Sequence, residues 1–204
     1  MIIHNFEQGT DDWYKIRLGK FTASHCQEIA NDGKGLETLV KEKACEILTG
    51  KAKETFKSEA MERGNELEHN ARQMFEFITG LTVEQVGFYE LDEFTGASPD
   101  GLTSDDGLVE IKCPTAKVFL EYMLDGKVDT KYMWQMQMQM MITEKKHCYY
   151  TVFNPDFENP IIIKKIDRDD DKIEKIKAGL ESGIKQLKEI LNKVKGKEIN
   201  EWSK

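Results

Sequence analysis

The segment SPDGLTSDDGLVEIKCP, residues 98–114, constrains the fold most, because it joins a turn to a strand and carries charge at fixed positions on both. Asp100 lies in a Pro-Asp-Gly turn signal, and Glu110 follows inside an apolar run with the composition of a strand. Side chains two residues apart on a strand share a face. Glu110 and Lys112 are therefore expected to point the same way, with Ile111 directed into the core.

These residue types suit one kind of chemistry. Asp100 and Glu110 can supply oxygen ligands to a hard divalent cation such as Mg²⁺, and Lys112 beside them can orient or help to deprotonate an attacking water. This arrangement is typical of a metal-dependent nuclease. A chain with 32% charged residues also produces such a pattern by chance, so the motif alone does not decide the function.

Composition narrows the class of protein. The 204 residues fit a single domain spanning 1–204, and the net charge of −8 disfavours a protein that binds DNA on an open basic face. The four cysteines are widely spaced without a CxxC pair, which predicts a reduced, cytoplasmic protein without a structural zinc site. We expect no signal peptide and no membrane span, because the chain lacks a long apolar run.

Hydrophobic periodicity predicts helices and strands in alternating groups. Helices are expected over residues 11–18, 36–48, 58–79, 118–125, 130–143 and 169–195, and strands over residues 81–91, 108–112, 147–153 and 161–166. This order predicts an α/β or α+β domain with a central mixed sheet flanked by helices. The last helix, about 169–195, is expected to pack on the core or to form a subunit contact. Residues 31–35 are expected to form a loop, and residues 51–57 an exposed basic connection that could touch DNA.

Two groups of residues in the first 80 positions each allow two interpretations. Thr22 or Ser24 is expected to cap a helix, and with Arg17 such a cap can bind a phosphate, although a plain cap with a solvent-exposed arginine is the simpler interpretation. Glu68 and Arg72 have the i,i+4 spacing of a surface ion pair, yet Glu68 could equally face the metal site.

The segment YMWQMQMQMMI within residues 130–143 combines alternating methionines and glutamines. The methionines are expected to pack in the core. Polar groups on a buried helix need partners, so one of the glutamines is expected to face the site.

Five segments in the same order resemble the lambda exonuclease and YqaJ-type viral recombinase family, within the PD-(D/E)XK nuclease superfamily. They are WYKIRLG at residues 13–19 with TAS at 22–24, GNELEHNARQMFE at 64–76, SPDGL at 98–102, EIKCP at 110–114 and YMWQMQ at 132–137. The similarity covers about residues 6–166. Five collinear segments are far more specific than the two-carboxylate motif alone.

The resemblance implies a restriction-endonuclease-like core and a 5′-to-3′ exonuclease on double-stranded DNA ends. It implies dependence on Mg²⁺, with Mn²⁺ as an acceptable replacement, and release of mononucleotides that leaves a 3′ strand for an annealing protein. It further implies a ring-shaped homotrimer around DNA and a phage or prophage protein in the bacterial cytoplasm. The loop at residues 31–35 departs from the family in being shorter and less basic.

The resemblance also assigns roles by position. Asp100, Glu110 and the Ile111 carbonyl would hold metal, Lys112 would serve the attacking water, Glu68 would support the metal site, Gln135 would border it, and Arg17, Ser24 and Ser98 would hold the 5′-phosphate. On this basis the phosphate interpretation of Arg17 and Ser24 replaces the simpler one.

Two other functions remain compatible with the sequence. A PD-(D/E)XK endonuclease or resolvase with the same metal core would nick closed circular DNA, which an exonuclease would leave intact. A non-catalytic protein that binds or anneals DNA ends would bind without cleaving, although the intact set of Asp100, Glu110 and Lys112 argues against it.

Overall fold

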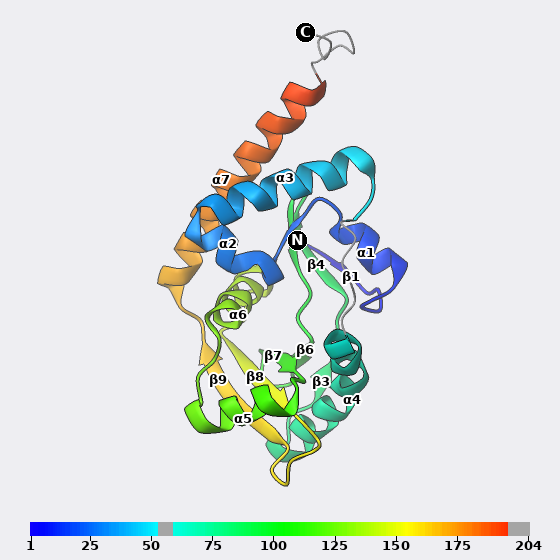
Figure 1. The fold of residues 1–204 in the computed structure, drawn as a ribbon, viewed down its shortest axis with the longest axis vertical. Helices are drawn as coiled ribbons and strands as arrows, with labels where there is room; N and C mark the ends of the chain where they lie inside the picture. The colour runs from blue at the N-terminus through cyan, green and yellow to red at the C-terminus, as the bar shows by residue number, and fades with distance from the viewer. Residues whose placement is uncertain (53–58, 196–204) are drawn as a thin grey trace.

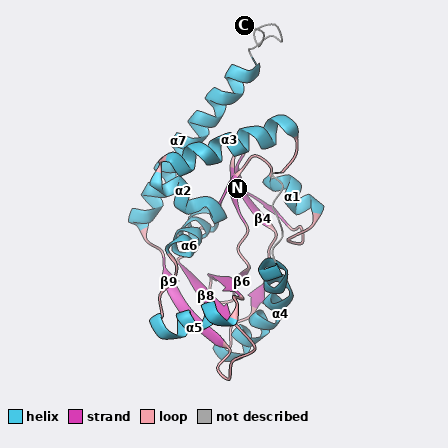
Figure 2. Ribbon diagram, viewed as in Figure 1, coloured by secondary structure: helices cyan, strands magenta, loops and turns pink. Residues whose placement is uncertain are grey.

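A computed structural model describes residues 1–52 and 59–195 (Figure 1). Its strands form two sheets with helices packed around them (Figure 2). In chain order the elements are β1 (Ile2–His4), α1 (Asp11–Arg17), β2 (Phe21–Thr22), the 3₁₀ helix η1 (Ala23–His25), α2 (Cys26–Asn31), α3 (Lys34–Thr49), α4 (Glu59–Thr79), β3 (Val83–Glu84), β4 (Phe88–Asp92), β5 (Thr95–Ala97), β6 (Gly101–Thr103), β7 (Gly107–Lys112), α5 (Ala116–Asp125), α6 (Thr130–Thr143), β8 (His147–Phe153), β9 (Ile161–Asp167) and α7 (Asp170–Lys195).

The larger sheet carries the charged motif. Its order is β3-β6-β7-β8-β9, in which β6 and β7 form an antiparallel hairpin and β7 and β8 run parallel. Parallel neighbours need a crossover connection, and here α5 and α6 provide it. The crossover brings α6 against the sheet face that carries Glu110.

Alternation along β7 places its side chains on two different faces of the sheet. Val109 and Ile111 are buried in a cluster with Ala71 and Phe75 of α4, while Leu108, on the opposite face, is buried with residues of α5, α6 and β8. Glu110 and Lys112 share the face of Leu108 by the strand period of two. The predicted orientation of these side chains relative to Ile111 is therefore confirmed.

The smaller sheet, of order β1-β4-β5-β2, lies with α2, α3 and α7 in the other half of the molecule (Figure 1). The long helix α7 packs on α2 at Gly179, where an added Cβ would lie 1.9 Å from the carbonyl oxygen of Ile29. Beyond this contact α7 also packs on α3, and Leu187 and Leu191 are buried in the same hydrophobic cluster as Leu36. No helix in the described ranges is long and apolar enough to cross a membrane.

The α/β class, the mixed sheet and the flanking helices are confirmed, but three local expectations are wrong. The strands form two sheets instead of one, because β4 and β5 pair with the short strands β1 and β2. Neither Thr22 nor Ser24 caps a helix through its side chain. Residues 31–35, expected to form a loop, contain only a turn at Asp32 and Gly33 between α2 and α3. Of the basic segment 51–57, residues 53–57 lie outside the described residues.

Candidate active site

Asp100 is held at the start of the β6–β7 hairpin. Its Oδ2 accepts a hydrogen bond of 2.6 Å from the backbone N–H of Ile111. The preceding turn is fixed as well, since the amide of Gln8 donates to the carbonyl oxygen of Pro99 at 2.9 Å. The carboxylate of Asp100 is therefore tied directly to the strand that bears Glu110.

Glu110 is completely buried, and its carboxylate accepts three hydrogen bonds. Oε1 accepts from Lys112 Nζ at 2.5 Å and from Gln135 Nε2 at 2.6 Å, and Oε2 accepts from Gln139 Nε2 at 2.7 Å. A buried carboxylate without such donors would be very unfavourable. Lys112 and the two glutamines of α6 thus supply the donors that this buried carboxyl group needs.

Charges at the site act strongly on one another. The pKa of Asp100 lies well above its usual range because burial disfavours its charge, and the charges of Glu110 and Glu68 add to this effect. Burial acts to lower the pKa of Lys112, but the carboxylates of Glu110 and Asp100 outweigh it and raise that pKa. Two repelling carboxylates with one neighbouring ammonium form a site that favours additional positive charge.

Glu68 forms the ion pair that its spacing predicts, and it also acts on the charge of Asp100. Its Oε1 accepts a hydrogen bond of 2.8 Å from Arg72 Nη2 on the next turn of α4, as the i,i+4 spacing predicts. Its charge also raises the pKa of Asp100, so it lies within electrostatic range of the carboxylate pair. The predicted support of the metal site by Glu68 remains a prediction.

Ser98 and Arg17 are brought together from distant parts of the chain. Strands β2 and β5 pair in parallel, with Thr22 opposite Gly96. This pairing places the segment that follows α1 beside β5, the strand that ends directly before Ser98. Arg17 Nη1 donates to Ser98 Oγ at 3.3 Å, and Trp13 Nε1 donates to the same oxygen at 2.9 Å. The Arg17 guanidinium also lies 4.0 Å from the centre of the Trp13 ring.

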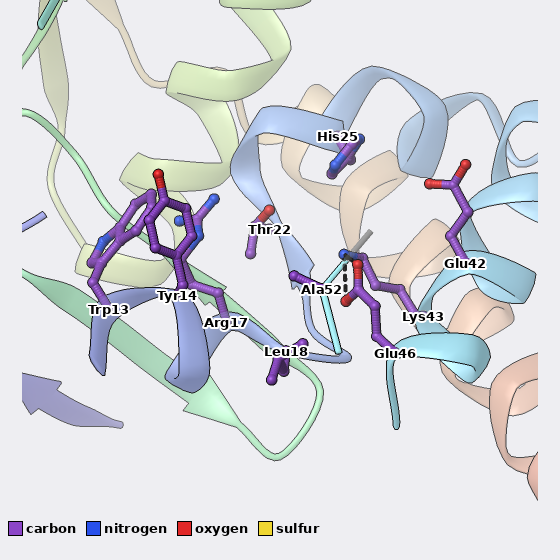
Figure 3. A pocket seen from close by; sticks show the side chains of 10 residues that line it. All are labelled: Trp13, Tyr14, Arg17, Leu18, Thr22, His25, Glu42, Lys43, Glu46 and Ala52. Atoms are coloured by element: carbon purple, nitrogen blue, oxygen red, sulfur yellow. Dashed lines mark hydrogen bonds and ion pairs between the residues drawn. The ribbon is translucent and has the colours of Figure 1, made fainter. Parts of the chain in front are cut away.

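A pocket of about 240 Å³ opens beside Arg17 (Figure 3). Trp13, Tyr14 and Arg17 form one side of it, Thr22 lies between, and the ion pair of Lys43 with Glu46 lies opposite. Burial lowers the pKa of Arg17 to about 10, which leaves the guanidinium positively charged at neutral pH.

Gly19, two residues after Arg17, contacts the side of the pocket formed by α3. Its φ is +72°, and a Cβ there would lie 2.4 Å from Ile47. Its N–H donates to Glu46 Oε2 at 2.8 Å. Only glycine allows both the left-handed backbone and this close approach.

Ser24 is the predicted phosphate residue that the structure leaves apart from the others. Its side chain is exposed, and its Oγ lies 3.1 Å from Thr22 Oγ1. Thr22 itself lines the pocket with Arg17. Ser24 therefore borders the pocket through its neighbour, while Arg17 and Ser98 are in direct contact.

The donor set fits a magnesium ion. Among residues 1–52 and 59–195, no group of three or more His, Cys, Asp or Glu side chains is arranged to hold a metal. Mg²⁺ in phosphate-processing sites is bound by one or two carboxylates together with substrate phosphates, and so it does not need a third. Asp100 and Glu110 would supply the carboxylates.

Comparison with known proteins identifies the fold and its chemistry. Residues 12–146 match the YqaJ-like viral recombinase domain. The chain belongs to the YqaJ-like viral recombinase family. It is also similar to the crystal structure of the alkaline exonuclease LHK-Exo from Laribacter hongkongensis, with a TM-score of 0.85 and 33% identity over 91% of this chain and 96% of that one. The family and this neighbour show that the chain is a deoxyribonuclease of the exonuclease type.

Two further structures extend the comparison. LHK-Exo in complex with dAMP matches with the same TM-score of 0.85, 33% identity and coverage of 91% of this chain and 96% of that one. A phage-related exonuclease from Haemophilus somnus matches with a TM-score of 0.68 and 18% identity over 86% of this YqaJ-like chain and 96% of that one, which supports the fold alone. No curated protein matches the chain significantly.

The sequence analysis did not predict the contacts of two residues at the site, Gln139 and Trp13. Gln139 donates to Glu110, although only one of the three glutamines was expected to face the site. Gln137 instead bonds Asp167 and Asp169, on the opposite side of α6. The i,i+4 spacing of Gln135 and Gln139 was the signal that both share a face. For Trp13, whose indole binds Ser98, no local pattern predicted a partner 85 residues away.

Proposed function

We propose that this YqaJ-family nuclease is a Mg²⁺-dependent 5′-to-3′ exonuclease that acts on double-stranded DNA ends. It begins at 5′-phosphorylated ends, releases mononucleotides and leaves a 3′ single strand for an annealing protein. The structure of LHK-Exo with dAMP, a nucleoside monophosphate, is consistent with a mononucleotide product.

The observation that carries the proposal is the position of Ser98 relative to Asp100. Ser98 is bound by Arg17 and Trp13, and it precedes Asp100 by only two residues. Two residues of chain span at most about 7 Å. A phosphate seated at Ser98 and Arg17 would therefore lie close to the carboxylate pair, as removal of terminal nucleotides requires.

The chemistry of Ser98 suits an anion. Its hydroxyl has two acceptor lone pairs and one donor, and Trp13 and Arg17 both donate to its oxygen. The O–H remains available to donate to a phosphate oxygen. Arg17 adds a positive charge in a half-buried position, where charge-assisted hydrogen bonds are strong. Ser24 would contribute from the rim of the pocket.

Each charged residue of the site then has a task in hydrolysis. When bound, Mg²⁺ supplies polarisation of the phosphate and a lowered pKa of water. Asp100, Glu110 and the Ile111 carbonyl would hold the ion. Lys112 would orient the attacking water through its ammonium, which the raised pKa keeps protonated in the structure as it stands. Gln135 and Glu68 would border and support this set.

The assembly and setting follow the family. We infer a homotrimer that encloses DNA, acting with a single-strand annealing protein in the cytoplasm of a bacterium that carries the phage. Enclosure reduces the need for electrostatic affinity, which is consistent with a net charge of −8.

The test is digestion of linear duplex DNA with Mg²⁺, labelled separately at the 5′ and 3′ ends, with closed circular DNA alongside. We expect early release of the 5′ label as mononucleotide and an intact circle. The variant Glu110→Gln, which keeps the shape of the side chain, is the inactive control. Nicking of the circle would indicate an endonuclease, and binding of ends without cleavage a non-catalytic protein.

A further inference from the structure

Gln139 lies at the back of the carboxylate site, on the third turn of α6. Its side chain is completely buried, and its Nε2 is 2.7 Å from Glu110 Oε2 and 3.5 Å from the backbone oxygen of Ser98. Both acceptors lie on the nitrogen side of the amide. The opposite orientation would turn the amide oxygen towards a carboxylate, so the contacts fix the direction of the amide.

The two oxygens of Glu110 have different surroundings. Oε1 accepts from Lys112 and Gln135, whose side chains are partly exposed, whereas the donor to Oε2 within the described part of the chain is the fully buried amide of Gln139. Oε1 is therefore the oxygen on the open side, and Oε2 is the oxygen anchored in the interior. A carboxylate held at one oxygen cannot rotate freely about its terminal bond.

We propose that Gln139 is a positioning residue that anchors Oε2 of Glu110, so that Oε1 stays directed to the metal-binding side of the site. This inference rests on the proposed Mg²⁺-dependent function. Residues that orient metal ligands typically change metal affinity or activity by about 10–100-fold when they are removed. The same amide also lies beside Ser98, so one side chain aligns the metal ligand with the segment that receives the DNA end.

The experiment compares Gln139→Met with Gln137→Met. Both replace a buried glutamine of α6 by an apolar residue of similar length, but Gln137 bonds Asp167 and Asp169 and does not contact Glu110. Calorimetric titration with Mn²⁺ alone measures metal binding without DNA. Nuclease assays over a range of Mg²⁺ concentrations give the half-activating concentration and the rate at saturation.

We expect Gln139→Met to weaken Mn²⁺ binding about 10–100-fold and to raise the half-activating Mg²⁺ concentration by a similar factor, with most of the saturated rate retained. Gln137→Met should lower the Tm and leave the affinity for Mn²⁺ unchanged. If Gln139→Met does not fold, Gln139→Asn keeps the amide but shortens its reach, and the same weakening is expected.

Two negative results are distinguishable. Wild-type affinity for Mn²⁺ in folded Gln139→Met or Gln139→Asn, beside an active wild-type enzyme, would overturn the positioning role alone. Absence of Mn²⁺ binding and of cleavage by the wild-type protein would instead overturn the proposed function, and the positioning role with it.

Discussion

The backbone N–H of Ile111 donates a hydrogen bond to Oδ2 of Asp100 at 2.6 Å, so the two predicted metal-binding carboxylates are fixed by one strand. Asp100 is bonded to the residue that follows Glu110, and neither position can shift without disturbing the β6–β7 hairpin. This coupling separates two effects of a substitution at Asp100, one on charge and one on the hairpin.

Asp100→Asn is expected to retain the fold and lose cleavage. The amide oxygen of asparagine can accept the same hydrogen bond from Ile111, and repulsion of Glu110 is removed, so the Tm should stay the same or rise. The rate should fall by more than about 100-fold, the upper effect of residues that only orient metal ligands. Asp105→Asn at the far end of the hairpin is the control and should cleave normally. A wild-type rate in Asp100→Asn would remove Asp100 from the site.

Lys112→Ala should abolish cleavage while DNA-end binding stays nearly intact. Glu110 keeps the amides of Gln135 and Gln139 as donors, so we expect a loss of only about 2–3 kcal/mol in the free energy of unfolding. Lys131→Ala is a matched control, because Lys112 and Lys131 lie 5.0 and 4.7 Å from the centre of the Tyr132 ring, and Lys131 is exposed. The measurement is the cleavage rate and the end-binding affinity of both variants beside the wild type. Cleavage by Lys112→Ala at the normal rate would exclude Lys112 from the mechanism.

Arg17→Ala should reduce the preference for 5′-phosphorylated over 5′-hydroxyl ends. Loss of the guanidinium removes the charge beside Ser98, and a charge-assisted hydrogen bond contributes about 1.5–3 kcal/mol, or roughly 10–100-fold in the ratio of rates. Lys15→Ala on the exposed side of α1 is the control, since Lys15 pairs with Asp12. An unchanged ratio would return Arg17 to a structural role.

The parts of the site that depend on local sequence were predictable, and the parts that depend on long-range pairing were not. Glu110 and Lys112 face the same side because a strand alternates, and this requires no knowledge of the rest of the chain. The contact between Arg17 and Ser98 spans 81 residues and depends on the pairing of β2 with β5. The resemblance to the family suggested this contact, whereas hydrophobic periodicity gives no information about contacts between distant segments.

The second sheet was missed for a related reason. Strand β2 has only the two residues Phe21 and Thr22, and such a short strand has no detectable alternation. Its formation depends on β5, which is itself three residues long. The long helices, by contrast, were predicted closely, since α3 ends at Thr49 with Gly50 as its C-cap and α6 spans the expected residues.

Gly179→Ala should destabilise the protein at the contact between α7 and α2. The new Cβ would lie 1.9 Å from the carbonyl oxygen of Ile29, and backbone cannot move aside as a side chain can. Overpacking of this kind costs about 1–3 kcal/mol, more than the roughly 1 kcal/mol that alanine gains over glycine in a helix.

Gly183→Ala on the same helix is the control. Its Cβ would meet the side-chain ends of Leu36 at 3.0 Å and of Phe21 at 3.3 Å, which need to move by only a few tenths of an ångström. Thermal unfolding of both variants should show a clear fall in Tm for Gly179→Ala and little change for Gly183→Ala. Equal Tm values would mean that α7 can shift on α2 without loss of stability.

Glu90 should make the stability of the smaller sheet depend on pH. Its carboxylate accepts hydrogen bonds from Lys20 Nζ at 2.7 Å and from His4 Nε2 at 2.8 Å, which lower its pKa. A carboxylate with a folded-state pKa below its unfolded value, about 4.3 for glutamate, stabilises the protein above that value. The stabilisation is lost as the pH falls through the folded-state pKa.

The measurement is the difference in Tm between the wild type and Glu90→Gln as a function of pH. Hydrogen bonds to a partly exposed charged group contribute about 1–2 kcal/mol, or about 2–8 °C for a chain of this size. We expect this difference to shrink below about pH 4, where the wild-type carboxylate becomes protonated. Glu93→Gln, at an exposed position on the following turn, should show no such dependence. A difference that persists unchanged in acid would show that Glu90 acts through its shape and packing, and that its charge does not stabilise the contact with Lys20.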